Sequence, residues 1–217
     1  MKAIIFANGE YRPTDNQINI IEDELIIAAD GGSAQCAWLG IIPDILIGDL
    51  DSTDPDLIQK WEAAGVKVIR YPADKDQTDL ELALLHAQAE GADKIVVYGA
   101  IGGRLDMTFG NLTLLAHPAL KILVKLVYGE EVVRLLREGE LLTLPGAIGD
   151  TISLIALDSR GAFVTTTGLE FPLDKEVLEF GLTKGISNRF VKKQATIYLE
   201  RGLLAVIHSQ QDPLEEK

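Results

Sequence analysis

Cysteine is almost absent from this chain, which restricts where the protein can work. Cys36 is the single cysteine among 217 residues, so no disulfide can form within the chain. Disulfide frameworks are typical of small secreted domains, whereas a lone thiol is typical of a reducing compartment. The sequence therefore predicts a cytoplasmic protein that is stabilised by a packed core instead of crosslinks.

Long apolar runs are also missing. No stretch approaches the roughly 20 apolar residues that a membrane-spanning helix requires. The run Met1–Phe6 contains one charged side chain and reaches Asn8-Gly9 too soon for a signal peptide, so we interpret it as a first strand. No membrane partner is expected.

Positive charge is scarce. The chain has 20 Lys and Arg against 33 Asp and Glu, which gives a formal net charge of −13. An acidic surface repels a phosphate backbone, so no nucleic-acid partner is expected. A polyphosphate ligand would need cations to neutralise the carboxylates, whereas a cationic co-substrate would be attracted by them.

Strand-like and helix-like segments alternate through roughly the first 120 residues. Short aliphatic runs such as Ile45–Ile47 are typical of strands buried in a parallel sheet. Ser33 is expected to cap a short helix, and Thr78 followed by Glu81 forms a capping box. The alternation predicts a parallel, Rossmann-like α/β domain over residues 1–128, with helices on the faces of the sheet.

The pattern changes in the remainder of the chain. Short apolar runs, among them Val132–Arg137 and Leu203–His208, are separated by turn signals such as Pro145-Gly146. Short strands at this spacing predict an all-β module, interpreted as a sandwich, over residues 129–217. Its last residues, 211–217, are polar and acidic and are expected to fray.

The unusual motifs of the first half all follow predicted strands. Because the carboxyl ends of parallel strands meet at one edge of a sheet, where open α/β sheets bind ligands, we expect these motifs to line one crevice. They are Asp30-Gly31-Gly32, Asp49-Leu50-Asp51-Ser52, the segment Asp74–Asp79, and Gly99–Asp106.

Carboxylates dominate two of these motifs. Asp49 and Asp51 stand two residues apart at a strand end, and oxygen donors at that spacing suit a hard cation such as Mg²⁺. Asp79, at the start of a helix, would add a third metal carboxylate. The structural alternatives are a helix cap after the strand and a helix-stabilising charge at Asp79.

The glycine-rich stretch Gly99–Arg104, between a predicted strand and a predicted helix, is suited to anions. Successive glycines let backbone N–H groups approach phosphates, and Arg104 adds a planar donor fork. Lys75 either meets a phosphate as a point charge or is solvated, and Asp106 is within reach of the same crevice. The chain contains neither a P-loop nor a G-x-G-x-x-G fingerprint, and a tight turn with an exposed arginine is the structural alternative.

In order and spacing, these motifs resemble those of the thiamine pyrophosphokinase family. The resemblance covers nearly the whole chain, because two stretches of the second half also look like signatures of that family. The matching motifs are Asp30-Gly31-Gly32, Gly48–Ser52, Lys75–Asp79, Gly102–Asp106, Thr166–Leu169 and Gly185–Asn188.

The resemblance implies transfer of a pyrophosphoryl group from ATP to the hydroxyethyl oxygen of thiamine, which yields thiamine diphosphate and AMP. It implies a catalytic domain over residues 1–128 that binds ATP and Mg²⁺. It also implies a thiamine-binding β-sandwich over residues 129–217, and a homodimer with thiamine near the subunit interface.

The same resemblance implies roles for individual residues. Asp106 would lie at the reacting centre and orient the attacking hydroxyl, and it forms the expected catalytic set with Asp79 and Arg104. Mg²⁺ would be held by Asp49, Asp51 and Asp79. Substrate contacts would come from Asp30, Gly31, Gly32, Lys75, Asp76, Gly102, Gly103 and Arg104 for ATP, and from Ser187 and Asn188 for thiamine.

One position departs from the family pattern. Members usually have His or Gln directly after the aspartate of the Gly-Gly-Arg motif, and here that position is Met107. A thioether cannot hydrogen-bond strongly or shuttle a proton. Either the polar residue is dispensable, or this chain has altered chemistry or substrate. Because the metal carboxylates are intact, we favour a tuned activity over a dead enzyme.

Three other functions remain open. A pyrophosphokinase for another hydroxymethyl heterocycle, such as a pterin, would keep the metal and ATP residues and change the second pocket. A non-catalytic nucleotide- or thiamine-binding module would bind its ligands without forming AMP. A structural β-sandwich adaptor with an unrelated α/β domain would bind no nucleotide.

Overall fold

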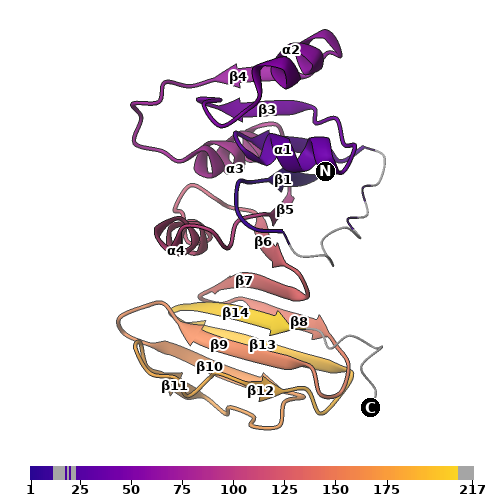
Figure 1. Ribbon diagram of the computed structural model, residues 1–217. Coiled ribbons are helices and arrows are strands. Elements are labelled where there is room, and N and C mark those ends of the chain that lie inside the picture. Colours follow the sequence, from indigo (N-terminus) through magenta and orange to yellow (C-terminus); the bar gives the residue numbers. More distant parts are fainter. Residues whose placement is uncertain (12–17, 19, 21–22, 210–217) are drawn as a thin grey trace. The chain divides into compact units, whose positions relative to one another are not determined.

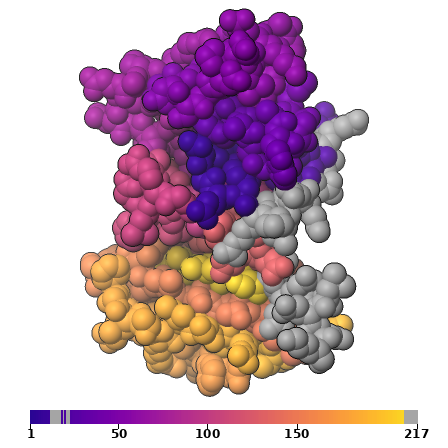
Figure 2. All heavy atoms as spheres, in the orientation of Figure 1, coloured from indigo at the N-terminus to yellow at the C-terminus, as the bar shows by residue number. Residues whose placement is uncertain are grey.

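The computed structural model describes residues 1–11, 18, 20 and 23–209. The chain divides into two compact units, Met1–Gly129 and Glu130–Lys217, whose ribbon and surface are drawn in Figures 1 and 2. The tail at 211–217, which is expected to fray, lies outside the described residues.

The described strands of the first unit form a parallel sheet. Their order is β6-β5-β1-β2-β3-β4, so the chain begins in the middle, adds three strands on one side and then returns to the other (Figure 1). In a parallel sheet, a crevice opens beside the carboxyl ends of the strands where the order reverses. The strands are β1 (Lys2–Phe6), β2 (Leu25–Ala29), β3 (Ile45–Gly48), β4 (Lys67–Arg70), β5 (Lys94–Tyr98) and β6 (Leu123–Tyr128).

Helices cover the sheet of the first unit. Residues 3–6 of β1 are at most 1% exposed, so both faces of this central strand are buried. Phe6 belongs with Cys36 of α1 and Trp61 of α2 to one buried cluster. Helix α3 packs against β1, β2 and β3. The helices of the described chain are α1 (Gly32–Trp38), α2 (Pro55–Ala63), α3 (Asp79–Ala89) and α4 (Leu105–Leu114).

Helix starts agree with the sequence in one case and differ in another. At α3, the Glu81 N–H donates to Thr78 Oγ1 at 3.2 Å, as the capping box predicts. The prediction that Ser33 caps α1 is wrong, because α1 begins at Gly32 and has no side-chain cap. Gly32 permits this early start: a Cβ there would lie 2.0 Å from the carbonyl oxygen of Phe6, so only glycine lets the helix begin against β1.

Every described element of the second unit is a strand. The strands pair antiparallel in two sets, with the orders β12-β9-β14-β7 and β11-β10-β13-β8 (Figure 1). Buried side chains of both sets, such as Ile152 and Ile197, form one cluster. The strands are β7 (Glu131–Arg137), β8 (Leu141–Pro145), β9 (Thr151–Ala156), β10 (Ala162–Thr167), β11 (Glu176–Leu178), β12 (Asn188–Arg189), β13 (Gln194–Arg201) and β14 (Leu203–Ser209).

The chain is thus a mixed α/β protein, with a parallel, helix-covered sheet followed by antiparallel strands. The short strands β11 and β12 were not expected, because two or three residues carry too little alternation to reveal a strand. Within the described ranges, none of the helices has the length and apolar character that crossing a membrane requires.

Candidate active site

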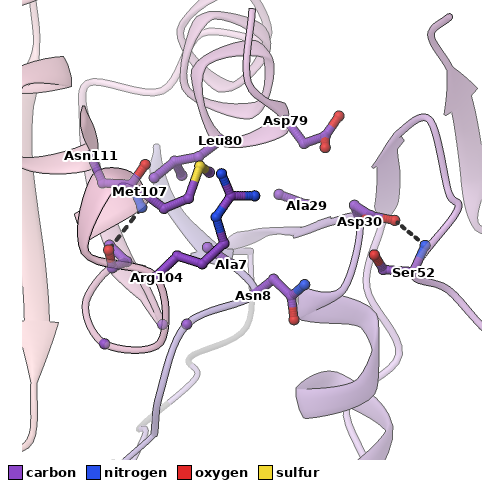
Figure 3. A pocket seen from close by; sticks show the side chains of 14 residues that line it. Ala7, Asn8, Ala29, Asp30, Ser52, Asp79, Leu80, Arg104, Met107 and Asn111 are labelled. Carbon is purple, nitrogen blue, oxygen red and sulfur yellow. Dashed lines mark hydrogen bonds between the residues drawn. The ribbon is translucent and has the colours of Figure 1, made fainter. Parts of the chain in front are cut away.

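A pocket opens at the carboxyl ends of the central strands of the first unit, where the strand order reverses between β1 and β5 (Figure 3). Its walls come from the segments after β1, β2, β3 and β5, from the first turn of α3, and from Met107 and Asn111 of α4. Asp30, Asp79 and Arg104 all lie in its lining. Three motifs that are distant in the sequence therefore share one pocket.

Three carboxylates, here called the carboxylate group, meet at this edge of the sheet: Asp30 after β2, Asp49 after β3 and Asp79 in α3. Each offers an oxygen within 4.8 Å of those of the other two. Gly48 makes the approach possible, because a Cβ there would lie 3.0 Å from Asp79 Oδ1. Asp30 is 7% exposed and is oriented by the Ser52 N–H, which donates to its Oδ1 at 3.3 Å (Figure 3).

Asp51 lies outside the carboxylate group formed by the described residues. The intervening Leu50 adopts a φ of 64°, and this turn leaves Asp51 exposed, with its Oδ1 accepting a hydrogen bond from Ser52 Oγ at 3.0 Å. Of the three aspartates that the sequence assigned to a metal, the structure therefore brings together Asp49 and Asp79. It adds Asp30, which the sequence had assigned to ATP.

The Lys75 ammonium lies between two members of the carboxylate group. Its Nζ is 3.3 Å from Asp49 Oδ2 and 3.1 Å from Asp79 Oδ1, and the side chain is 10% exposed. Burial alone would lower the pKa of Lys75, but the ion pairs with Asp79 and Asp49 outweigh burial, and the pKa is raised. Lys75 is therefore a held positive charge inside the acidic site, not a solvated loop lysine.

The two carboxylates that pair with Lys75 have opposite pKa shifts. Burial raises the pKa of Asp79, and the negative charges of Asp49 and Asp30 act in the same direction, although Lys75 opposes them. The Asp51 N–H donates to Asp49 Oδ1 at 3.2 Å, and this bond, helped by Lys75, lowers the pKa of Asp49. Asp79 is thus the carboxylate that would gain most from a further cation.

The glycine-rich loop after β5 uses its amide donors within the protein. The Gly102 N–H donates to Thr108 Oγ1 at 3.0 Å, and the Gly103 N–H donates to Glu10 Oε1 at 3.1 Å. Gly102 and Gly103 have φ angles of +91° and +67°, which favour glycine. These two glycines therefore set the path of the loop, and any contact with a nucleotide stays a prediction.

Arg104 lines the pocket (Figure 3). Its side chain is paired with Asp106. Its Nη2 lies 2.6 Å from Asp106 Oδ2 and its Nε lies 3.1 Å from Oδ1, which makes a two-pronged ion pair. The hydrogen bonds with Arg104 lower the pKa of Asp106, and the same pair raises the pKa of Arg104. Asp106 is thus an anion that holds the guanidinium at the pocket.

The other residues expected to contact ATP are Gly31, Gly32 and Asp76. Gly31 and Gly32 follow Asp30, and a Cβ at Gly31 would lie 2.2 Å from the side chain of Asn8, so the segments after β1 and β2 touch there. Asp76 is exposed and lies outside the described lining of the pocket.

Ser187 and Asn188, the expected thiamine residues, lie in the second unit. The Asn188 side chain accepts a hydrogen bond from the Phe171 N–H at 3.1 Å and donates one to the Phe171 carbonyl at 2.7 Å. Ser187 is exposed, with a φ of 60°, and its N–H donates to Ser153 Oγ at 3.1 Å. Asn188 therefore fixes the backbone at Phe171, whose side chain is 65% exposed.

Two asparagines that line the pocket, Asn8 and Asn111, were not predicted as site residues from the sequence (Figure 3). Asn8 lies two residues after the end of β1, and a polar residue just after a strand is the signal that marked the other motifs. Asn111 is 6% exposed and donates from Nδ2 to the carbonyl of Ala100 at 2.8 Å. It carries no local signal, because only the packing of α4 against the loop brings it to the pocket.

Comparison with known proteins connects these features to one family. The family model described as "Thiamin pyrophosphokinase, catalytic domain" matches residues 19–126, and that described as "Thiamin pyrophosphokinase, vitamin B1 binding domain" matches residues 140–204. A thiamine pyrophosphokinase of Bacillus subtilis (strain 168) is 32% identical over 190 residues, which cover 87% of this chain and 88% of that protein.

Solved structures agree. The crystal structure of thiamine pyrophosphokinase from Bacillus subtilis has a TM-score of 0.86 at 28% identity and covers 98% of this chain and 100% of its own. That from Geobacillus thermodenitrificans has a TM-score of 0.84 at 29% identity and covers 98% and 99%. Because both family models match, and a relative more than 30% identical is covered along most of its length, the chain belongs to the thiamine pyrophosphokinase family.

Proposed function

We propose that this protein transfers a pyrophosphoryl group from ATP to the hydroxyl of thiamine, giving thiamine diphosphate and AMP. The observation that carries the proposal is the carboxylate group around Lys75 beside a pocket at the reversal point of the sheet. Phosphoryl transfer relies on positioning and charge neutralisation more than on a nucleophilic side chain, and this site offers fixed charges of both signs.

The carboxylate group fits Mg²⁺. Asp79 Oδ1 is buried and accepts no directed hydrogen bond in the described chain, although the Lys75 ammonium lies 3.1 Å from it. Clustered carboxylate oxygens are the ligands that Mg²⁺ prefers, and it usually keeps water and phosphate in its shell. Asp49 and Asp79 would hold the ion, with Asp30 beside them, and bound Mg²⁺ would supply charge neutralisation for the phosphates. Asp51 would have to turn toward the group to join it.

The phosphates of ATP would meet the positive side chains at the pocket. Arg104 offers a planar donor fork that suits phosphoryl oxygens, and Asp106 holds this fork in place. Lys75 adds a point charge beside the carboxylate group. Asp106 would accept the proton of the attacking hydroxyl. Its hydrogen bonds with Arg104 lower its pKa and weaken it as a base, so Asp106 would become a stronger base when Arg104 turns to the phosphates.

The two parts of the chain would divide the work. Residues 1–128 would form a Rossmann-like catalytic domain that binds ATP and Mg²⁺. Residues 129–217 would form a β-sandwich that binds thiamine and dimerises, which the single buried cluster shared by both sets of strands supports. Ser187 and Asn188, beside the exposed Phe171, would belong to the thiamine pocket. The enzyme would work in the cytoplasm as a homodimer.

A second candidate, a binding module without catalysis, is favoured by one observation. Met107 lines the pocket near Arg104, at the position where the family usually has a polar residue (Figure 3). A thioether cannot take part in proton transfer there.

Phosphorus NMR of the protein with ATP, Mg²⁺ and thiamine separates these functions. The proposal predicts that AMP and thiamine diphosphate form together, without free phosphate. Formation of AMP with a hydroxymethylpterin in place of thiamine would change the acceptor but keep the pyrophosphoryl transfer. Stabilisation by ATP or thiamine without any AMP would establish the binding module.

A further inference from the structure

Glu10 connects the segment after β1 to two distant parts of the first unit. Its Oε1 accepts a hydrogen bond from the Gly103 N–H at 3.1 Å, and its Oε2 accepts one from the Tyr128 hydroxyl at 3.1 Å. Gly103 belongs to the glycine-rich loop after β5, whereas Tyr128 is the last residue of β6. One carboxylate thus bridges three segments, and both of its oxygens are used.

The backbone beside Glu10 fixes the position of this bridge. The Gly9 N–H donates to the Gly99 carbonyl at 2.7 Å, and the Glu10 N–H donates to the Ile101 carbonyl at 2.8 Å. The side chain then packs tightly on the loop, because a Cβ at Gly102 would lie 2.6 Å from the Glu10 side chain. Backbone hydrogen bonds between the segment after β1 and the loop after β5 therefore place the Glu10 carboxylate beside the loop.

The bridge acts on the residue next to Arg104. Gly103 has a φ of +67°, and a Cβ there would have no atom within 4 Å, so its surroundings restrain it little. The hydrogen bond from its N–H to Glu10 orients the peptide that joins Gly102 to Gly103, and Gly103 directly precedes Arg104. Arg104 is the N-cap of α4 and lines the pocket, so the placement of Gly103 affects the point at which the Arg104 side chain leaves the backbone.

We propose that Glu10 is a positioning residue for ATP binding, which holds the glycine-rich loop so that Arg104 faces the pocket. The effect of Glu10 on ATP binding rests on the proposed function, whereas the hydrogen bonds that Glu10 accepts from Gly103 and Tyr128 do not. Glu10 lies outside the described lining of the pocket, and as an anion it would repel phosphates. Its effect therefore comes through the Gly103 amide and the Tyr128 hydroxyl, not through contact with substrate.

Hydrogen exchange of the Gly103 amide, followed by NMR, tests the bridge without any substrate. Glu10→Ala should accelerate this exchange about tenfold or more, because the amide loses its acceptor. The Gly9 amide, bonded to a backbone carbonyl, should keep its rate. Glu10→Gln, which can still accept from Gly103 and donate to Tyr128, should restore the wild-type rate. Unchanged exchange at Gly103 in Glu10→Ala would overturn the proposal.

Steady-state kinetics test whether Glu10 supports ATP binding. In Glu10→Ala, KM for ATP should rise about five- to tenfold, the loss expected for one or two partly exposed hydrogen bonds, while KM for thiamine stays constant. Tyr128→Phe should give a smaller rise, and Glu10→Gln should remain near wild type. Glu179→Ala, which removes an exposed carboxylate of the second unit, is the matched control and should change neither constant.

The positioning role of Glu10 and the proposed function would be contradicted by different results. An unchanged KM for ATP in Glu10→Ala, despite faster exchange at Gly103, would overturn the positioning role. A wild-type protein that does not convert ATP to AMP would contradict the proposed function instead, and the exchange rates would still decide whether Glu10 holds the loop.

Discussion

Lys75 balances part of the negative charge that Asp49 and Asp79 bring together. Like charges at this separation repel, and a nearby ammonium reduces that cost. The pKa of Asp79 is nevertheless raised, mainly because the carboxyl group is buried and to a lesser extent because Asp49 and Asp30 carry negative charge. The site is thus formed at a cost in stability that a bound cation would offset.

Removing either carboxylate should abolish most activity without harming the fold. Asp49→Asn and Asp79→Asn should each lower turnover by orders of magnitude, because a neutral amide is a poor ligand for Mg²⁺. Turnover is measured by AMP formation, and folding by circular dichroism. Glu179→Gln is a matched surface control that should keep full activity. Unchanged turnover in Asp49→Asn would contradict the metal site.

The pKa of Asp79 gives a prediction with a definite sign. Its folded-state pKa is raised, so the proton is bound more tightly in the folded than in the unfolded chain. Stability from this residue is therefore present below the ordinary Asp pKa of about 3.9 and lost as pH rises through the raised value. In EDTA, Asp79→Asn should melt at a higher temperature than wild type at neutral pH, and this advantage should shrink on acidification. A variant that melts lower at neutral pH would contradict the prediction.

Met107 tests how much the family's polar residue matters in this chain. Met107→His should leave turnover within about a factor of ten, because a general acid–base group contributes roughly 10²–10⁴-fold only where it is needed. Met107→Leu keeps the apolar character and serves as the control. A thousandfold gain in Met107→His, measured by AMP formation, would show that this position limits the natural enzyme.

At the scale of elements, close backbone approaches decide where helices begin. Gly32→Ala should lower the free energy of unfolding by about 2 kcal/mol or more, because the new Cβ would lie 2.0 Å from the carbonyl oxygen of Phe6. Gly110 lies inside α4 with open space around its Cβ position. Gly110→Ala should therefore stabilise by about 0.5–1 kcal/mol. Urea denaturation measures both, and equal effects of the two substitutions would refute the steric argument.

The sequence predicts the helices and strands better than the details of the site. The family and the enzyme class are confirmed, and the capping box at Thr78 is found in the structure. Spacing alone grouped Asp51 with Asp49, because a sequence does not reveal that Leu50 turns the backbone with a φ of 64°. Asp30 joins Asp49 only through the pairing of β2 with β3.

The cap at Ser33 and the loop after β5 show the same limit. A serine after a strand is a common helix cap, but α1 begins earlier because Gly32 fits against the carbonyl oxygen of Phe6. Glycines before a helix are typical of phosphate-binding amides, yet the amides of Gly102 and Gly103 already donate to protein oxygens. Both outcomes depend on contacts with residues far away in the sequence.

For the whole molecule, the net charge of −13 predicts opposite salt effects on the two substrates. Thiamine carries a positive thiazolium, which the acidic protein attracts, so raising KCl from about 20 to 200 mM should raise its KM about two- to fivefold. KM for the anionic ATP should stay constant or fall over the same range. A KM for thiamine that does not change with salt would show that long-range attraction does not contribute.

Cys36, a buried residue of α1, allows opening of the first unit to be measured separately. Burial raises the pKa of its thiol to about 12, so the folded protein holds almost no reactive thiolate at neutral pH. The chain has no other cysteine, and the second unit has none. Alkylation of Cys36 in the native protein therefore proceeds only when the first unit opens. The rate of alkylation measures how often this unit opens and does not report opening of the second unit.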